Sequence, residues 1–215
     1  MPRAMPGLAR EYRSAVAAAL GIARAGDIIR DLSKPGSRAR RELSVARLDA
    51  LYEMAYLRIF VGWEYFVEAS FLRMMCGYQS PIWTPGFSSG KARLTTLSAA
   101  RIALYKGRRY LLWHNPKDIR DRSQEWFDTG PHELVAISSF SRLEWFAAVR
   151  HRIAHGSDDA RSQLDIATIN LCGRRFRGSS AGRFLRAWDE STMPRQRWLS
   201  TVADELANLA AQITP

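Results

Sequence analysis

The sequence predicts an all-α fold, a bundle of about five to seven helices. Apolar residues recur at three- and four-residue spacing over several long segments, and no segment shows the alternation of a half-buried strand. Clusters of Gly and Pro separate these segments, where helices are expected to end. We therefore expect a single helical domain over residues 1–215, because this length is typical of one domain.

Two long helices are predicted in the first third of the chain. The first covers Leu8 to Leu32, is rich in Ala and Leu, and stops at the Ser-Lys-Pro-Gly sequence of residues 33–36. The second runs from near Arg41 to about Cys76 and is apolar over more than half of its circumference, which predicts a central or interface helix. It is roughly 54 Å long at 1.5 Å per residue, so we expect a kink at Gly62.

The remaining segments alternate between loops and helices. In chain order we expect a Pro/Gly/Ser-rich loop at about 78–91, a weaker helix over Leu94–Lys106, a helix over Pro116–Phe127 that begins with Pro, a strong helix over His132–His155 that ends at Gly156, a less regular segment over Ser157–Asn170, a basic Gly/Ser-rich loop at about 174–182 and a last helix over Pro194–Ile213.

The charge of the chain favours an anionic partner. Lys and Arg number 32 and Asp and Glu 21, which gives a net charge of +11. Because 28 of the 32 basic residues are Arg and Ala is abundant, coding bias alone would also produce this composition. The charge therefore indicates RNA or another polyanion only in combination with other observations.

Several classes of protein are excluded by composition. Cys76 and Cys172 lie far apart in the sequence, which argues against a zinc ribbon or a redox pair. The most apolar stretch, Met54 to Met75, contains four charged residues and is not expected to span a membrane. No secretory signal is visible at the N-terminus, so we expect a soluble cytoplasmic protein.

The end of the predicted helix over His132–His155 concentrates ionisable side chains. Its last residues, Arg150-His151-Arg152-Ile153-Ala154-His155, carry two imidazole and two guanidinium groups. His151 and His155 have the spacing of two zinc ligands, but Arg152 stands where a metalloprotease has Glu, so no metal is expected. A structural alternative exists, since a cationic His at a helix C-terminus gains about 0.3–1 kcal/mol from the helix dipole.

This segment resembles the motif of HEPN domains. These domains carry Arg-x4–6-His near the end of an amphipathic helix, and the residue after the Arg is commonly Asn, Asp or His. Arg150, His151, His155 and the following Gly156 fit that pattern. The segment Gly62-Trp63-Glu64-Tyr65-Phe66 is similar to the Trp-Glu helix of some bacterial HEPN families. The resemblance covers residues 41–77 and 134–156.

The resemblance implies a helical domain that dimerises about the motif helix and, in active members, cleaves RNA without a metal or another cofactor. The residue types suit this chemistry. His155 can act as base or acid near neutral pH, and Arg150 offers a permanently charged planar fork for phosphate oxygens. We therefore predict Arg150 and His155 as the catalytic residues.

Helical geometry constrains how these two residues can cooperate. Five residues at about 100° each place Arg150 and His155 roughly 140° apart around an ideal helix. Either the last turn is distorted before Gly156, or a second chain completes the site across a two-fold axis. We favour the homodimer, in which one imidazole serves as base and the other as acid. His151, roughly 40° from His155, is either a supporting site residue or a surface His.

Further residues are predicted to support the site. Glu64 is either a buried partner for an Arg, such as Arg150, or an exposed carboxylate. The predicted RNA contacts form two basic clusters, one of Lys106, Arg108 and Arg109 and one of Arg174, Arg175 and Arg177. Phe176 in the second cluster would be available to stack on a base. Both clusters are alternatively solvated basic surface.

The sequence thus predicts a metal-independent endoribonuclease of HEPN type that cleaves RNA by 2′-hydroxyl transesterification. A toxin–antitoxin or antiviral defence setting is expected, with an antitoxin protein as a possible partner. The alternative is a non-catalytic HEPN-like module that binds nucleotide or RNA or mediates dimerisation. A helical scaffold protein, in which the motif is a chance match, is the third hypothesis.

Overall fold

The chain is predominantly helical, as predicted. A computed structural model describes residues 3–176 and 180–215. Within these residues the helices are α1 (Leu8–Leu32), α2 (Arg38–Glu42), α3 (Val45–Met75), α4 (Leu97–Tyr105), α5 (Pro116–Trp126), α6 (Pro131–Ser138), α7 (Phe140–Ala154), α8 (Asp158–Cys172), α9 (Ala181–Arg186) and α10 (Trp198–Ile213). No helix among the described residues is both long and apolar enough to cross a bilayer.

Short strands accompany the helices. Strands β1 (Arg3–Ala4) and β2 (Tyr78–Gln79) pair in parallel, and β3 (Trp188–Asp189) and β4 (Gln196–Arg197) pair antiparallel. Two residues per strand are too few to show an alternating pattern, which is why the sequence did not predict them. Strand β4 also delays the start of α10, which the sequence placed at Pro194.

The ten helices of the described residues exceed the predicted five to seven, because the sequence analysis did not predict α2, α8 and α9 as helices and did not predict the break between α6 and α7. The helix predicted over His132–His155 is interrupted at Ser139, which leaves helical geometry at φ −120° and ψ 23°. The less regular segment predicted after Gly156 is helix α8. Its N-cap Ser157 accepts a hydrogen bond from the Ala160 amide at 3.2 Å, and two Asp residues follow in the first turn, where the helix dipole favours them.

Helix α3 differs from its prediction at its start. The predicted start near Arg41 belongs to the separate helix α2, which ends before Leu43. Gly62, where a kink is predicted, lies inside α3. A Cβ added at Gly62 would stand 3.2 Å from the Tyr12 ring, so the glycine allows this ring to approach the helix closely.

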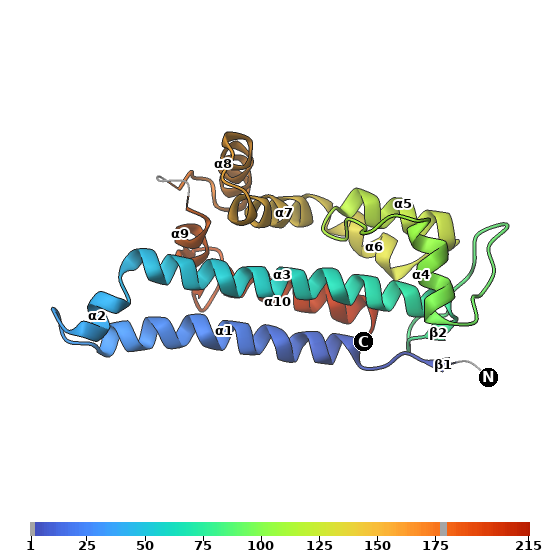
Figure 1. The fold of residues 1–215 in the computed structure, drawn as a ribbon, viewed down its shortest axis with the longest axis horizontal. Coiled ribbons are helices and arrows are strands. Elements are labelled where there is room, and N and C mark those ends of the chain that lie inside the picture. The colour runs from blue at the N-terminus through green and yellow to red at the C-terminus, as the bar shows by residue number, and fades with distance from the viewer. Residues whose placement is uncertain (1–2, 177–179) are drawn as a thin grey trace. The chain divides into compact units, whose positions relative to one another are not determined.

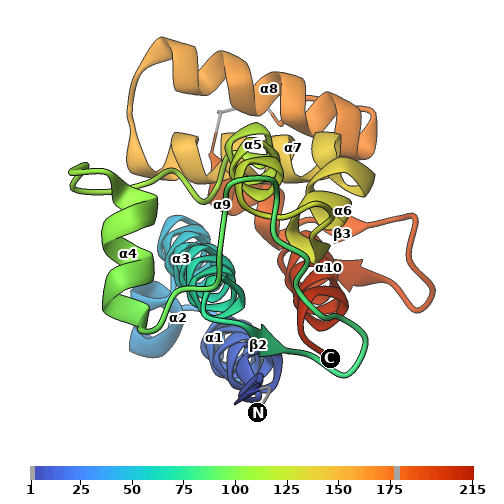
Figure 2. The ribbon, with the colours of Figure 1, turned by 90° about the vertical axis from the view of Figure 1, so that its right-hand side faces the viewer.

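The structure divides into two compact units. Unit 1 comprises residues 1–13, 62–144 and 206–215, and unit 2 comprises residues 14–61 and 145–205. In unit 1, α5 packs beside α6, and α4 stands beside the second half of α3, where Arg101 and Tyr105 both donate hydrogen bonds to Glu68 (Figure 2). The largest fully buried side chains of unit 1 are Trp63, Phe71, Met74, Met75 and Phe127.

In unit 2, the parts of α1 and α3 within residues 14–32 and 45–61 run side by side in opposite directions (Figure 1). Gly26 permits their close approach, because a Cβ there would stand 3.0 Å from a methyl carbon of Leu51. Helix α9 is fixed on α3 in a similar way. A Cβ at Gly182 would overlap the Asp49 carbonyl oxygen, and the Gly182 amide donates to Glu53 at 2.8 Å.

Candidate functional site

Helix α7 carries the predicted motif and is anchored in unit 2 by its apolar face. Phe146 and Val149 are fully buried on this face. The buried Tyr56 hydroxyl donates a hydrogen bond to the Phe146 carbonyl at 2.6 Å, so α3 holds the middle of α7 in place. The motif therefore lies on a helix with a fixed position within this unit, as a catalytic constellation requires.

Arg150 follows the buried face directly and has an unsatisfied polar atom. Its Nε is buried and has no hydrogen-bond partner among the described residues. Buried polar groups without a partner are rare, and each costs about 1–3 kcal/mol of stability. Arg150 is only half-buried as a residue, so an oxyanion would meet the outer nitrogens of its guanidinium and not the buried Nε.

The two imidazoles of the motif lie against each other. The ring centroids of His151 and His155 are 4.6 Å apart at an interplanar angle of 50°, which confirms that they share one side of the helix. Nε2 of His151 lies 4.0 Å from a carboxylate oxygen of Asp159 on α8. His155 itself is exposed, so its ring is accessible to a large substrate.

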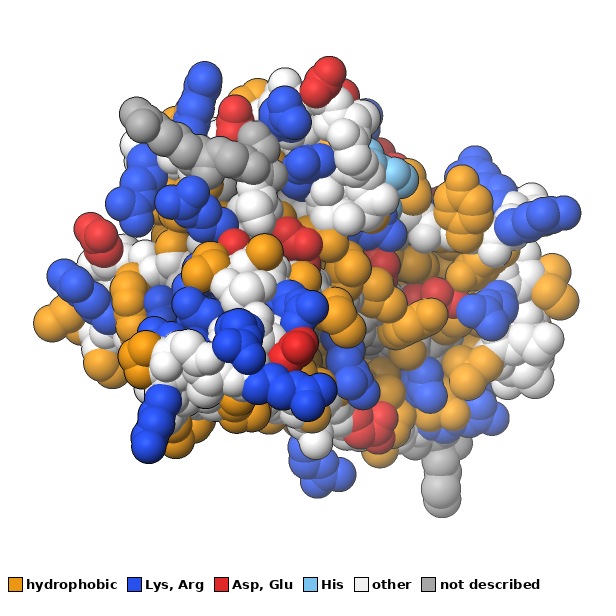
Figure 3. All heavy atoms as spheres, turned by 60° about the vertical axis from the view of Figure 1, so that its left-hand side comes forward, with side chains coloured by type: hydrophobic (Ala, Val, Ile, Leu, Met, Phe, Trp, Pro, Cys, Tyr) orange, Lys and Arg blue, Asp and Glu red, His pale blue; other side chains and the backbone are white. Residues whose placement is uncertain are grey.

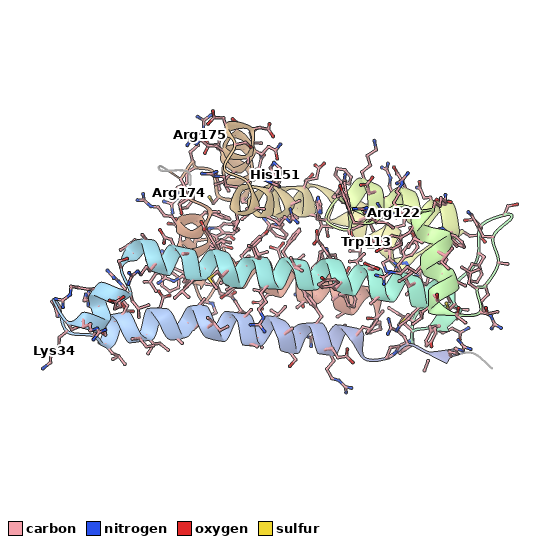
Figure 4. The ribbon with its side chains drawn as sticks, in the orientation of Figure 1. Lys34, Trp113, Arg122, His151, Arg174 and Arg175 are labelled. Carbon is pink, nitrogen blue, oxygen red and sulfur yellow. The ribbon has the colours of Figure 1, made fainter. Side chains whose placement is uncertain are left out.

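The last turn of α7 keeps its helical hydrogen bonds. The His155 amide donates to the His151 carbonyl at 2.9 Å, the pattern of an undistorted α-helix. Arg152 donates to the His155 carbonyl at 3.1 Å and so caps the helix end. A distorted last turn therefore does not bring Arg150 and His155 together, and the completion of the site by a second chain stays the prediction. Figure 4 marks the position of His151 on α7.

Glu64 has a different partner from the one predicted. In unit 1 its Oε1 lies 2.7 Å from Nδ1 of His114, and both side chains are largely buried. The segment that carries His114 is fixed on both sides, by buried Trp113 and by Asn115, which caps α5. The pairing of His114 with Glu64 was not predicted from the sequence, although the place of His114 between a Trp and an Asn-Pro helix start indicated a constrained backbone.

The fourth histidine, His132, belongs to the core of unit 1. It is fully buried, and its Nε2 lies 2.8 Å from the Ser70 hydroxyl. Burial lowers the pKa of His132 from its ordinary value of 6.5 to about 3, so the ring stays neutral in the folded chain. His132 is therefore a structural residue.

One residue of the first basic cluster, Lys106, forms an ion pair within the protein. Nζ of Lys106 lies 2.7 Å from Oε1 of Glu125, which Lys91 also contacts at 3.0 Å. The two lysines hold the pKa of the Glu125 carboxyl below its usual range, mainly through the hydrogen bond from Lys106. Arg108 and Arg109 are exposed and line an open groove of about 560 Å³ with Tyr105.

The second basic cluster projects from the segment after α8. Arg174 and Arg175 are exposed on this segment (Figure 4), and the guanidinium carbon of Arg174 lies 5.3 Å from the centre of the Phe176 ring. Phe176 is not free to stack on a base as predicted, because its ring packs edge-on against Phe184 at 5.4 Å. Arg177 lies outside the described residues. Lys and Arg side chains, interspersed with apolar ones, also spread over the face drawn in Figure 3.

Comparisons with family models, with curated proteins and with solved structures find no match for this chain. Within residues 3–176 and 180–215, no group of three or more His, Cys, Asp or Glu side chains is placed to hold a metal ion. The observations that bear on function are therefore those at the end of α7.

Proposed function

We propose that this chain is a metal-independent endoribonuclease of HEPN type that acts as a homodimer. One observation carries the proposal: the end of α7 combines an Arg150 Nε that is buried without a partner among the described residues with two adjacent imidazoles, one of them exposed. The unpaired Nε costs the fold stability, and the combination of a guanidinium with an exposed imidazole supports a site at this helix end.

The residues can divide the steps of RNA transesterification between them. His155 takes the proton from the 2′-hydroxyl, and the resulting 2′-oxygen attacks the adjacent phosphorus. Arg150 stabilises the negative charge on the pentacovalent phosphorane. The bond to the 5′-oxygen breaks, and a second imidazole donates a proton to this oxygen, which gives a 2′,3′-cyclic phosphate and a 5′-hydroxyl. His151 supports the site through the contact between its ring and that of His155.

A second chain supplies what one helix lacks. Arg150 and His155 point to different sides of an undistorted α7, and a single exposed His155 cannot be base and acid in the same step. A two-fold axis near the ends of two α7 helices brings two copies of each residue together. Sedimentation of the purified chain is expected to give the mass of a dimer, and a monomer that cleaves RNA would contradict this arrangement.

The proposed setting is a toxin–antitoxin or antiviral defence system in the cytoplasm. The net charge of +11 supports RNA as the substrate, since cationic surfaces release the counterions of a phosphate backbone. Exposed Arg108, Arg109, Arg174 and Arg175 are the proposed backbone contacts. A dedicated antitoxin protein is the proposed partner in such a system.

The test is cleavage of a mixed RNA pool in EDTA by the wild-type chain and by the Arg150→Ala and His155→Ala variants. We expect the wild type to leave 2′,3′-cyclic phosphate ends and both variants to be inactive. Arg161→Ala is the matched control, because Arg161 is an exposed arginine on α8 whose ion pair among the described residues is with Asp158, at 3.7 Å. Equal cleavage by all four proteins would overturn the assignment of the site.

A non-catalytic RNA- or nucleotide-binding module is the second candidate function. The exposure of Arg108, Arg109, Arg174 and Arg175 favours it, because these residues support binding whether or not the chain cleaves. Salt-sensitive RNA binding by a folded dimer that never cleaves would select this function. Restoration of cleavage by added cell extract would instead indicate a missing activator.

A further inference from the structure

An open groove in unit 2 has features of a ligand site and contains no residue of the α7 motif. Its volume is about 400 Å³, which is within the usual range for small-molecule sites. Helix α1 forms one wall, and the β3–β4 hairpin with the start of α10 forms the other. The buried side chains beneath it are Leu20, Ala23, Tyr52 and Leu199.

Trp188 offers the groove a planar apolar surface. Its side chain is 47% exposed, which is unusual for the largest apolar residue type, and it lines the groove. The guanidinium of Arg197 lies 3.9 Å from the centre of the Trp188 ring and holds one side of it. Arg197 is itself fixed, since it donates to the Arg186 carbonyl at 2.8 Å. The indole is therefore a pre-positioned stacking surface.

Two guanidinium groups in the groove have no ion-pair partner among the described residues. Arg24 on α1 and Arg195 before β4 are both exposed and line the groove. Neither forms an ion pair with another residue in the described parts of the chain. Two unpaired guanidiniums at one groove fit a dianionic group such as a phosphate monoester, whose charge near pH 7 is about −1.5 to −2.

The two carboxylates of the groove differ in the hydrogen bonds and ion pairs that they form among the described residues. Asp27 accepts a hydrogen bond from the Tyr52 hydroxyl and lies 3.8 Å from a nitrogen of Arg197. Asp204 on α10 is exposed and forms no ion pair with any residue that the structure describes. Its carboxylate can accept hydrogen bonds from a ligand. Guanine offers two N–H donors on one edge, at N1 and N2, whereas adenine and cytosine offer only an amino group beside an acceptor.

We infer that this groove binds a guanine nucleoside phosphate, with the base stacked on Trp188, its N–H edge on Asp204 and its phosphate on Arg24 and Arg195. The guanine contacts are the same for a free nucleotide, whose phosphate is a monoester, and for a guanine nucleotide within an RNA strand, whose phosphate is a singly charged diester. The inference does not depend on the proposed nuclease activity, because the groove residues and the α7 motif are separate sets.

Calorimetric titration of the full chain with GMP, AMP, CMP, UMP and guanosine at fixed ionic strength tests this inference. GMP is expected to bind most tightly. Trp188→Ala should weaken GMP binding roughly ten-fold, since base stacking on an aromatic ring is lost. Arg195→Gln should weaken GMP roughly ten-fold but leave guanosine unchanged, because only the charged hydrogen bonds to phosphate are lost. Asp204→Asn should abolish the preference for GMP over AMP.

Matched controls are Tyr110→Ala, an aromatic residue 74% exposed elsewhere, and Arg38→Gln, an exposed arginine on α2. Both should bind GMP as the wild type does. Absence of GMP binding to the folded wild type at millimolar concentration would overturn the inference. Equal GMP affinity in Trp188→Ala, Arg195→Gln and the controls would also overturn it.

An all-deoxy trinucleotide with dG at its centre separates the two sources of the ligand. None of its nucleotides carries a 2′-hydroxyl, so its binding is measured without cleavage. Tighter binding of the trinucleotide than of GMP supports an RNA subsite, and the reverse supports a free nucleotide. The His155→Ala variant should bind GMP normally, so that failure of this inference and failure of the nuclease proposal are distinguishable.

Discussion

The core histidine of unit 1 and the histidine pair of unit 2 show opposite uses of the same side chain. His132 is fully buried, bonded to Ser70, and its pKa is lowered to about 3 by burial. His155 is exposed at the end of α7, with its ring tilted at 50° against that of His151, and Nε of Arg150 on the same helix is buried without a partner among the described residues. Burial keeps the His132 imidazole neutral in the folded chain. The His155 imidazole is instead exposed to solvent.

The comparison shows that the role of a histidine in this chain depends on its burial in the fold. Its neighbours in the sequence do not indicate that role. His132 begins a predicted helix and His155 ends it, and nothing in the sequence around His132 indicates that it is buried. If the contrast is right, changes at His132 alter stability and changes at the α7 end alter activity. The following predictions test that separation.

The largest expected effect is on catalysis at the α7 end. His155→Ala should lower RNA cleavage by roughly 10²–10⁴-fold, the usual contribution of general acid–base catalysis. Because the side chain is exposed, the free energy of unfolding should change by less than about 0.5 kcal/mol. Cleavage rates and urea denaturation of the same preparations measure both quantities. A large loss of stability with unchanged specific activity would reverse the assignment.

The next effect is on stability in the core. His132→Ala should lower the free energy of unfolding by about 2–4 kcal/mol, because it opens a cavity and removes the hydrogen bond between Nε2 and the Ser70 hydroxyl. Cleavage per folded molecule should match the wild type. Urea denaturation followed by circular dichroism gives the stability. A variant that is stable but inactive would show that His132 takes part in catalysis.

The low pKa of His132 also predicts how stability depends on pH. Below pH 6.5 the unfolded chain protonates this imidazole while the folded chain does not, until about pH 3. The free energy of unfolding should therefore fall as the pH drops from 6.5 to 5, with a contribution of at most about 1.4 kcal/mol per pH unit from this group. His132→Gln should make the decline shallower. An identical slope in the variant would contradict the neutral buried ring.

The smallest expected effect on stability concerns Arg150. Arg150→Met keeps most of the side-chain volume and removes the buried Nε that has no partner, so the free energy of unfolding should rise by up to about 1 kcal/mol. Cleavage should be lost at the same time. Thermal denaturation and the EDTA assay test the pair of outcomes. A strongly destabilised Arg150→Met variant would mean that the guanidinium has a structural role.

Sequence periodicity was sufficient for the long helices, because each buries a continuous apolar face. Helices α1 and α5 lie close to their predicted bounds, and Asn115 and Pro116 start α5 as expected. The break at Ser139 was not predictable in the same way, since the apolar pattern continues across it. Helix α8 was missed although Ser157 and the two Asp residues after it form an N-terminal capping signal.

The candidate site was predictable only in part. The shared side of His151 and His155 follows from their four-residue spacing, and the structure confirms it. The partner of Glu64 did not follow, because His114 lies fifty residues away and only the tertiary fold of unit 1 brings the two together. Long-range pairs such as this one leave no periodic trace in a single sequence.

The most direct test of the central claim uses an RNA oligonucleotide with one mapped cleavage position. Replacing the single nucleotide on the 5′ side of that bond by its 2′-deoxy form removes the attacking hydroxyl and nothing else. We predict that the wild-type chain, in EDTA, no longer cuts this bond while it still cuts other RNA. Cleavage of the deoxy-substituted bond at an unchanged rate would contradict 2′-hydroxyl attack and with it the roles assigned to Arg150 and His155.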